Sequence, residues 1–565
     1  MKTENNRPFR IEAIRIALVL VLFAECGMLL ANQGWRAQIM NIDLIPYPEA
    51  LSQLFQAGIF PERGVLTSYQ SFTPPGIAYL MLPGMLVFDD PRLFEIVGAS
   101  CTYVGTLIGI WLLTEQAYRR RCAMLAVMCY ALSGQGFFFA RSLWPRAHPF
   151  FFVWMIYFTL QWVKQRQGRF LAAAVFTWSI GLYMFLEIAP AILIFPVIWL
   201  RYRPPVKVRS LAMTGIVILL IWLPYLRFEY HRDFADVRSQ IFRQTLAAGD
   251  ERATWCDPTL PLETWPEQAA VSPVKQSAWW FPQTTNLFKR AWNRFYWTTR
   301  YTGDKLVWTT WWNGVNNFKM AYQSSIPIAL LGFVLTSGVV IAAVVADVRQ
   351  WRNVCGSEKG VIAICLLTPW LALWLLTDAG RADRFWWLWP LQAIFLAAVF
   401  TEFFENVMHS KKLALACQLL ILLLIATQPR IMQKVDAWRR DGWSGRDHER
   451  IQASDLLARQ FRATGITQAA IGYQILMYGW EPEFHRHDPQ YKVGADFDFY
   501  LQRKHGIINT NRCAEGIAAF DDYRIVQTAR TTDLNRYLRV HDWDKYEPIG
   551  EIGAYRIVKR KEQAE

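Results

Sequence analysis

The sequence lacks the motifs that mark most nucleotide-dependent and hydrolytic enzymes. It contains no Walker loop, no dinucleotide-binding glycine pattern, no Ser-His-Asp ordering and no paired metal cluster. Its nine cysteines show no metal-ligand spacing, and several fall inside apolar runs, where they are most simply small buried hydrophobic residues. The sequence therefore indicates no nucleotide cofactor and no metal, and it leaves metal dependence open.

Charged residues are also few relative to apolar ones. They make up 19% of the 565 residues, whereas hydrophobic residues make up 53% and aromatic residues 15%, with 27 tryptophans. Such a tryptophan load is typical of proteins with an extensive membrane interface. The net charge of +14 does not indicate a nucleic-acid partner, because much of the Lys and Arg lies in short loops between apolar windows.

The apolar windows predict a polytopic α-helical membrane protein. They recur through the first 430 residues and then stop. The first window follows a basic N-terminal region, but its run of ~20 apolar residues is too long for a signal peptide, so we expect an uncleaved first span. About eleven windows approach the length of a membrane span. They cover residues 12–31, 92–116, 122–140, 149–163, 169–185, 188–200, 210–227, 325–346, 361–377, 385–403 and 412–428.

The basic residues of the short loops predict the topology. Loops with clusters such as Arg119 to Arg121 alternate with loops that lack them, provided that residues 76–88 do not cross the membrane. That apolar segment is shorter than the ~20 residues of a spanning helix, so we expect a helix in the interface. By the positive-inside rule the basic loops and the N-terminus are cytoplasmic. The external face then collects residues 32–90, 142–148, 228–324, 377–384 and the tail.

Two of the external segments have distinctive compositions. The first loop, residues 32–90, carries Asp43, several tyrosines including Tyr69, and a Pro-Pro-Gly step at residues 74–76. The proline pair stops any helix from the loop and sets the direction of the next one. Segment 228–324 begins with a charged stretch and becomes rich in tryptophan. That composition favours a helix on the membrane surface, and a stacking platform for sugars is the alternative.

Residues 1–430 are thus expected to form the membrane domain, and residues 440–565 differ from them in composition. Residues 451–466 have helical periodicity, and residues 468–476, 522–530 and 549–560 are typical of strands. We expect a small soluble α/β domain of about 120 residues, on the external (periplasmic) side. Its histidines and acidic residues match no zinc spacing.

Asp43 is the principal candidate for catalysis. An outward-facing carboxylate a short distance beyond a membrane helix is suited to act as a general base toward an acceptor hydroxyl. One base is sufficient for a single displacement with inversion at an anomeric carbon. The alternative is an ordinary loop aspartate that caps a short helix near Pro46 or Pro48.

Several basic residues lie on the external face, against the usual bias. They are candidates for binding the phosphate of a lipid carrier, because arginine makes forked contacts with phosphate oxygens. The alternative is ordinary snorkelling at the interface. Glu187, between two apolar runs, is either a second acid facing a cavity or a plain turn residue. The candidates beside the spans are Arg141, Arg146 and His148, followed later by Arg381, Asp383 and Arg384.

These features together resemble a known family. Asp43 in a long loop is followed by PYPEALSQLFQAGIF, then by SFTPPGIAYLMLPGMLVF, and later by GQGFFFARSLWPRAHPFFF and RFWWLWPLQAIFLAAVF. This arrangement resembles the GT-C membrane glycosyltransferases, in particular the protein O-mannosyltransferase and aminoarabinose–lipid A transferase group. The similarity covers about residues 10–200 well and about residues 380–430 loosely.

The resemblance implies a polyprenyl-phosphate-linked sugar donor and transfer on the external face of the inner membrane. Asp43 matches the acid of the family's first loop, the family's proposed catalytic base. The sequence departs from the family at two positions. Thr73 stands where many relatives carry an acidic or charged residue before the Pro-Pro step, and Arg146 falls where many have an aspartate.

The sequence thus predicts an inverting glycosyltransferase with a lipid, glycan or protein acceptor. The main alternative is a translocator of polyprenyl-linked lipids or sugars that performs no chemistry. Translocators usually show pseudo-symmetric halves, and we detect no internal repeat. A second alternative is an inactive assembly partner, to which the missing second acid points.

Overall fold

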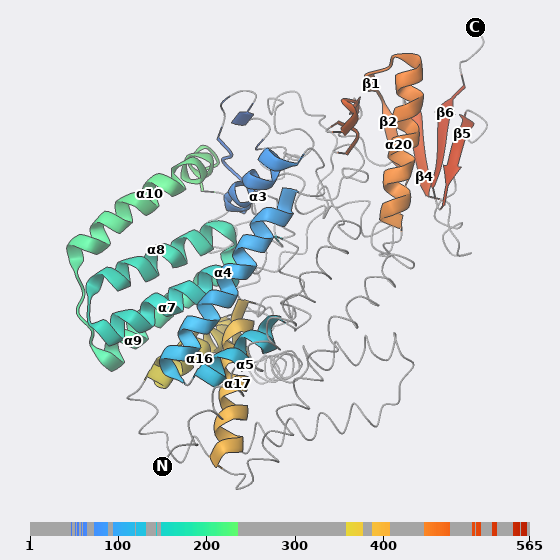
Figure 1. Ribbon diagram of the computed structural model, residues 1–565. Coiled ribbons are helices and arrows are strands. Elements are labelled where there is room, and N and C mark those ends of the chain that lie inside the picture. Colours follow the sequence, from blue (N-terminus) through green and yellow to red (C-terminus); the bar gives the residue numbers. More distant parts are fainter. Residues whose placement is uncertain are drawn as a thin grey trace, which may run out of the picture. The chain divides into compact units, whose positions relative to one another are not determined.

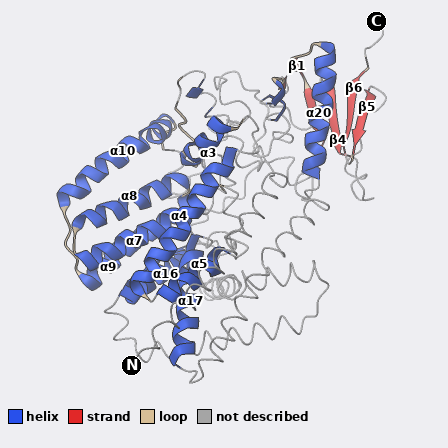
Figure 2. Cartoon of the chain, viewed as in Figure 1, coloured by secondary structure: helices blue, strands red, loops and turns tan. Residues whose placement is uncertain are grey.

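The computed structural model contains α-helices followed by a mixed β-sheet (Figures 1 and 2). It describes residues 47, 51, 54–55, 58, 60–64, 73–88, 94–118, 120–131, 143, 149–234, 358–376, 387–406, 446–474, 500–502, 504–509, 522–527, 546–553 and 555–561.

The chain divides into two compact units, each assembled from segments far apart in sequence. One unit comprises residues 1–36, 95–223 and 279–435. The other comprises residues 37–94, 224–278 and 436–565. The second unit therefore groups most of the first loop with the end of the helix at residues 208–231 and with the C-terminal segment.

Helices occur where the apolar windows predict them. The described helices at these windows are α4 (Phe94–Ala117), α5 (Arg120–Ala131), α7 (Pro149–Gln165), α8 (Gly168–Met184), α9 (Ile194–Tyr202), α10 (Val208–His231), α16 (Glu358–Leu376) and α17 (Trp389–Asn406). Of these, α4 and α10 are long and apolar enough to cross a membrane by length and composition. Three predicted spans, residues 12–31, 325–346 and 412–428, lie outside the described residues, so the predicted number of about eleven stays a prediction.

The helices of the first unit pack through aromatic rings and indole hydrogen bonds. Helix α7 packs against α8, and α17 against α5. Phe152 of α7 meets the Trp387 ring edge to face, with 4.5 Å between ring centroids. The Trp162 indole donates a hydrogen bond of 2.9 Å to the carbonyl of Pro205, 43 residues away. This bond gives the buried polar end of Trp162 a partner within the helix bundle.

The predicted turn at residues 186–187 is confirmed as a break in the helix. Helix α8 ends at Met184, and Phe185 is extended with φ −157° and ψ 136°. The chain continues as the 3-10 helix η3 (Leu186–Leu193), which contains Pro190, before α9 begins. A proline lacks the N–H that a continuous α-helix needs, which is consistent with the change of helix type.

Helix α3 (Gly76–Val87) follows the Pro-Pro step directly, as predicted. It has 12 residues, which is too short to cross a bilayer that needs ~20. Its last turn is closed by the Phe88 N–H, which donates to the Gly84 carbonyl at 2.9 Å. The length of α3 agrees with the expected interfacial helix, and its depth in a membrane stays a prediction.

The C-terminal segment contains helix α20 (Arg446–Thr464) and a four-stranded sheet. The sheet has the order β2 (Ile471–Gln474), β4 (Tyr523–Gln527), β6 (Tyr555–Arg560), β5 (Tyr546–Ile552). The β2–β4 pair is parallel and the other two pairs are antiparallel. Two short strands, β1 (Gln468–Ala469) and β3 (Ile508–Asn509), form a separate parallel pair.

Residues 549–560 form most of a hairpin and not a single strand. Strands β5 and β6 pair up to Ile552 and Tyr555, so only two residues connect them. Gly553 begins this connection with φ +55°, a conformation that a two-residue hairpin requires and glycine adopts without strain.

The core of this segment lies between α20 and the sheet. Leu457 and Phe461 of α20 are buried against Ile525 and Ile557. The Phe461 ring meets the Tyr523 ring edge to face at 4.6 Å. Burial raises the pKa of Tyr523, although the nearby Lys559 opposes the shift. The described residues of this segment thus combine a helix with strands, and the separate soluble domain stays a prediction.

We expect Phe461→Ala to loosen this core. Removing a fully buried phenylalanine costs about 3–5 kcal/mol, because it loses apolar contacts and leaves a cavity. Hydrogen–deuterium exchange of the full chain should show faster exchange in β2, β4 and β6. Ile508→Ala, at a partly exposed site, is the control. Equal protection in the two variants would contradict this assignment of the core.

Candidate functional site

Most of the residues predicted for the site lie outside the described residues. These are Asp43, Tyr69, Arg141, Arg146, His148, Arg381, Asp383 and Arg384. Their predicted roles therefore stay predictions. Glu187 is described, and its half-buried side chain lies in the first turn of η3, immediately after the break in the helix.

The described part of the first loop is organised around Thr73. The Thr73 hydroxyl lies 2.9 Å from the Tyr47 hydroxyl, and both side chains are buried. The Thr73 carbonyl accepts a hydrogen bond of 2.6 Å from the Gly64 N–H. Thr73 thus contacts two other parts of the first loop, through its hydroxyl group and through its carbonyl.

Gly64 allows this close approach of the chain to the Pro-Pro step. A Cβ atom at this position would lie 2.3 Å from the Thr73 hydroxyl oxygen, 2.7 Å from the Pro74 carbonyl oxygen and 2.8 Å from Cε1 of Tyr47. These distances are shorter than carbon contacts in proteins, so only glycine fits without a shift of the chain.

Two arginines contact one aromatic ring beside this junction. The guanidinium carbon of Arg63, next to Gly64, lies 5.6 Å from the centroid of the Phe228 ring on α10. That of Arg232, just beyond α10, lies 5.0 Å from the same centroid. Arg232 also forms an ion pair of 2.9 Å with Glu229, whose side chain is only 2% exposed. We call Arg63, Phe228, Glu229 and Arg232 the arginine cluster.

The end of α10 holds Arg232 in place. The Phe234 N–H donates to the Glu229 carbonyl at 2.7 Å, which closes the last turn. Asp233 and Phe234 have φ +51° and +55°, left-handed values that residues other than glycine rarely adopt. Such a strained end persists only where its surroundings enforce it, and functional sites are common among these places.

The arginine cluster has the chemistry of an anion-binding site. Two guanidinium groups lie against one aromatic ring, and that of Arg232 also pairs with the buried carboxylate of Glu229. The Nη1 atom of Arg63 and the Nη2 atom of Arg232 are both buried. Guanidinium groups that are shielded from water bind phosphate or carboxylate more strongly than exposed ones do. A purely structural role, joining the loop to α10, is the alternative.

A second ion pair lies at the surface of the same unit. Arg227 Nε lies 3.8 Å from Glu62, and the Arg227 side chain is 70% exposed. Exposed pairs of this kind contribute little to stability. Arg227 therefore offers a comparison residue for the two arginines of the cluster.

The sequence did not single out Arg63, Glu229 or Arg232. The two arginines could have been found by the criterion used for Arg141 and Arg146, which is a basic residue on the predicted external face. It could not show that Arg63 meets Phe228, because 164 residues separate them in the sequence.

One residue near the predicted site, Leu143, contacts the start of α4. Leu143 is buried, and its N–H donates to Glu95 Oε2 at 2.9 Å. Glu95 lies in the first turn of α4 and is itself buried. The buried carboxylate of Glu95 thus fixes the main chain of Leu143 relative to α4.

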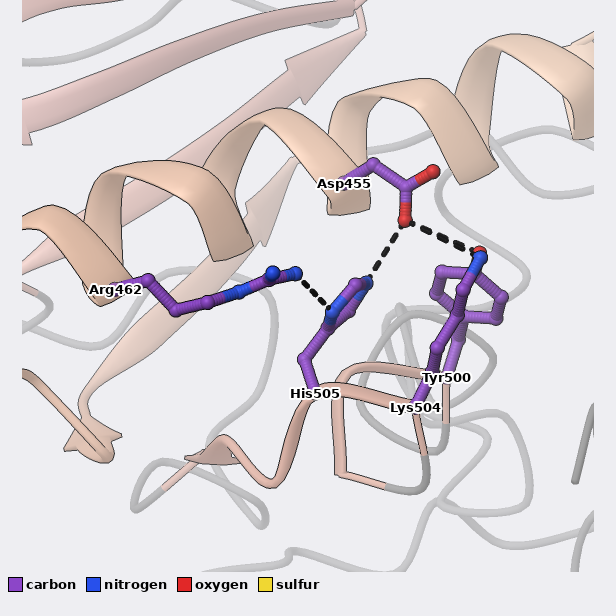
Figure 3. A network of polar contacts seen from close by, with 5 residues as sticks. All are labelled: Asp455, Arg462, Tyr500, Lys504 and His505. Carbon is purple, nitrogen blue, oxygen red and sulfur yellow. Dashed lines mark hydrogen bonds and ion pairs between the residues drawn. The ribbon is translucent and has the colours of Figure 1, made fainter.

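The C-terminal segment contains a separate polar network, which Figure 3 shows from close by. Arg462 Nη2 donates to Nδ1 of His505 at 2.7 Å, and Nε2 of His505 lies 2.8 Å from Asp455 Oδ1. Lys504 donates to the Tyr500 hydroxyl, which donates to Asp455 at 3.1 Å. Because a guanidinium only donates, Nδ1 accepts and the ring proton is on Nε2. Both ring nitrogens are thus engaged, so the network joins α20 to residues 500–505 and leaves His505 unsuited to act as a base.

Among the described residues, no group of three His, Cys, Asp or Glu side chains could hold a metal ion. Cys129 and Cys365 are buried as expected for small hydrophobic residues, whereas Cys101 is exposed. These observations concern only the part of the chain that the structure describes.

Comparison with solved structures identifies the fold. The chain is similar to ArnT, the aminoarabinose transferase, from Cupriavidus metallidurans in the apo state, with a TM-score of 0.51 and 12% identity over 98% of each chain. The chain has the fold of this transferase. The resemblance expected from the sequence is therefore confirmed at the level of the fold.

Two further comparisons were found. ArnT bound to undecaprenyl phosphate gives a TM-score of 0.49 and 13% identity over 97% of each chain. The apo oligosaccharyltransferase of Archaeoglobus fulgidus gives a TM-score of 0.40 and 12% identity over 75% of this chain and 56% of that chain. No family model and no curated protein matches the chain.

We expect Gly64→Ala to disturb the junction of the first loop. The added methyl group has no space, and overpacking of this kind costs about 1–3 kcal/mol. The midpoint of thermal unfolding in detergent should fall. Gly215→Ala is the matched control, because a Cβ atom in that turn of α10 meets nothing within 4 Å. Equal midpoints for the two variants would show that the approach at Gly64 is not tight.

Proposed function

We propose that the chain is an inverting glycosyltransferase. It moves a sugar from a polyprenyl-phosphate donor to a lipid, glycan or protein acceptor on the external face of the bacterial inner membrane. The observation that carries the proposal is the ArnT-like fold, which extends over 98% of both chains. The arginine cluster beside the first loop supports it, because such a donor presents a phosphate near the membrane surface.

Asp43 acts as the general base in the proposed reaction. Its carboxylate takes the proton of the acceptor hydroxyl, and the hydroxyl oxygen forms a bond to the anomeric carbon. The bond from that carbon to the phosphate oxygen breaks, and the electron pair leaves with the polyprenyl phosphate. Attack from the face opposite the leaving group inverts the configuration at the anomeric carbon.

Arginine side chains stabilise the leaving group. Negative charge develops on the phosphate as the bond breaks, and cations fixed in advance lower that barrier. Arg63 and Arg232 are proposed for this role on their geometry. Arg141, Arg146, Arg381 and Arg384 are proposed on the sequence pattern, with Tyr69, His148, Glu187 and Asp383 as further donor or acceptor contacts. The proposed orientation places the N-terminus in the cytoplasm and the segment 440–565 in the periplasm.

Asp43→Asn is expected to abolish transfer. The amide cannot accept the proton, and general-base catalysis typically contributes about 10²–10⁴-fold to the rate. Purified protein in vesicles of bacterial envelope lipids, which supply acceptor hydroxyl groups, is given undecaprenyl phosphate carrying mannose, glucose or aminoarabinose, and released undecaprenyl phosphate is quantified. Glu115→Gln, which changes an exposed acid on α4, is the control for loss of a carboxylate. Full turnover by Asp43→Asn would overturn the assignment of the base.

Arg63→Gln and Arg232→Gln are expected to weaken binding of undecaprenyl phosphate. Each removes a charged donor, and such bonds contribute roughly 1.5–3 kcal/mol, or about ten- to a hundredfold in affinity. Arg227→Gln is the matched control, because it removes the same group from a side chain that is 70% exposed. Binding of the lipid is measured by native mass spectrometry of the full chain in detergent. An equal loss of lipid binding in all three variants would show that the effect comes from the change in net charge and not from the positions of Arg63 and Arg232.

A further inference from the structure

Two turns of the first unit lie against each other, and both are strongly basic. One turn joins α7 to α8 and the other joins α9 to α10, and Figure 1 shows them at the same end of these helices. The two turns and the adjoining helix ends carry exposed basic side chains. We call these side chains the basic turn pair: Lys164, Arg166, Arg169, Arg201, Arg203, Lys207 and Arg209.

Two close contacts hold the turns together. The Arg166 guanidinium donates a hydrogen bond of 3.0 Å from Nη2 to the Arg203 carbonyl. The main chain of Gly168 lies so near the second turn that a Cβ atom there would be 2.7 Å from the main-chain nitrogen of Lys207. The basic side chains therefore belong to one surface with a fixed main chain, and not to two independent loops.

The basic turn pair has no acidic partner among the described residues. The ion pairs that the structure shows lie elsewhere in the chain. The sequence from residue 163 to residue 210 contains one acidic residue, Glu187. Glu187 lies beyond the far end of α8, a helix about 25 Å long. Cations gathered in this way without a counter-charge create a positive potential that attracts anions.

Two of the arginines occupy positions where glycine is usual. Arg166 directly follows α7 with φ +52°, and Arg203 is the C-cap of α9 with φ +46°. A left-handed residue at the end of a helix is most often glycine, because a Cβ atom is strained there. Strain of this kind is common at functional sites. The chain thus keeps a guanidinium group at two positions where glycine would fit the main chain better.

Apolar side chains beside the basic turn pair indicate a lipid and not a soluble anion. Trp199 and Leu200 of α9 are 47% and 67% exposed, and Val208, the first residue of α10, is 74% exposed. Helix α10 is long and apolar enough to cross a membrane, and only 6% of its apolar stretch is buried within the protein. An exposed apolar surface that ends in cations matches a phospholipid, in which acyl chains adjoin a phosphate group.

We propose that the basic turn pair binds the headgroup of an anionic phospholipid. The arginines make forked contacts with the phosphate oxygens, and the acyl chains lie along the exposed apolar side chains of α9 and α10. In the predicted topology these turns are cytoplasmic, on the face opposite to that of the proposed transfer. The binding does not depend on the proposed glycosyltransferase activity, so either can fail without the other.

Arg203→Gly is the most informative variant, because it removes a cation and also relieves the left-handed strain. The carbonyl that accepts the bond from Arg166 stays in place. The dissociation constant for phosphatidylglycerol is measured by native mass spectrometry of the full chain in detergent. It should rise about fivefold in Arg203→Gly and about 25-fold in the double variant Arg201→Gln/Arg203→Gly. The midpoint of thermal unfolding without added lipid should equal or exceed that of the wild type.

Three controls accompany these variants. Arg120→Gln removes an exposed cation from another basic turn on the same predicted face, so its dissociation constant should stay close to that of the wild type. Phosphatidylethanolamine, which has no net charge, should bind the wild type more weakly than phosphatidylglycerol does. Glycerol phosphate carries a phosphate without acyl chains, and an excess of it should not displace phosphatidylglycerol.

Several outcomes would overturn the proposed lipid site. An equal rise of the dissociation constant in Arg120→Gln and Arg203→Gly would show that only net charge matters. Equal binding of the two phospholipids, or displacement by glycerol phosphate, would show that the surface does not select an anionic lipid. If Arg203→Gly unfolds at a lower temperature than the wild type, Arg201→Gln decides, because its side chain makes no bond between the turns. An unchanged dissociation constant in Arg201→Gln would then overturn the site.

Discussion

Hydrogen bonding of polar groups in apolar surroundings is the constraint on which this structure depends. An unpaired main-chain or side-chain group costs several kcal/mol where no water is available, so helices predominate and every remaining polar group needs a partner. The few long-range bonds are placed where segments far apart in sequence must meet. Glu95 accepts a hydrogen bond from the Leu143 N–H, and the Trp162 indole donates one to the Pro205 carbonyl. The Tyr47 and Thr73 hydroxyl groups form a third such bond.

The same constraint explains why charge is concentrated at the ends of helices. Glu229 is buried, and the ion pair with Arg232 offsets the cost of its burial. Arg63 and Arg232 share the Phe228 ring, which screens both guanidinium groups from water. Guanidinium groups held in this way, in and beside a loop with a predicted base, are of the kind that binds phosphate. The polar network around His505 has a different character, because each of its groups is already used within the network.

Much of the helical architecture could be predicted from the sequence. The windows 149–163 and 169–185 became α7 and α8 almost residue for residue, and α3 began directly after Pro75. Hydropathy and proline act locally, so a window of the sequence contains the information needed. The hairpin of β5 and β6 was harder to predict, because apolar and polar residues continue to alternate past Gly553. Only the pairing of the two strands shows that the chain reverses direction there.

The sequence by itself determined the class of the protein, the positions of its helices and the resemblance to GT-C enzymes, since each follows from short-range composition. Only the tertiary structure decided that Thr73 is buried against Tyr47, that Gly64 must lack a side chain, and that Arg63 and Arg232 share one ring. These are relations between segments up to 169 residues apart. They follow from packing and from pairing of buried polar groups, which no local pattern records.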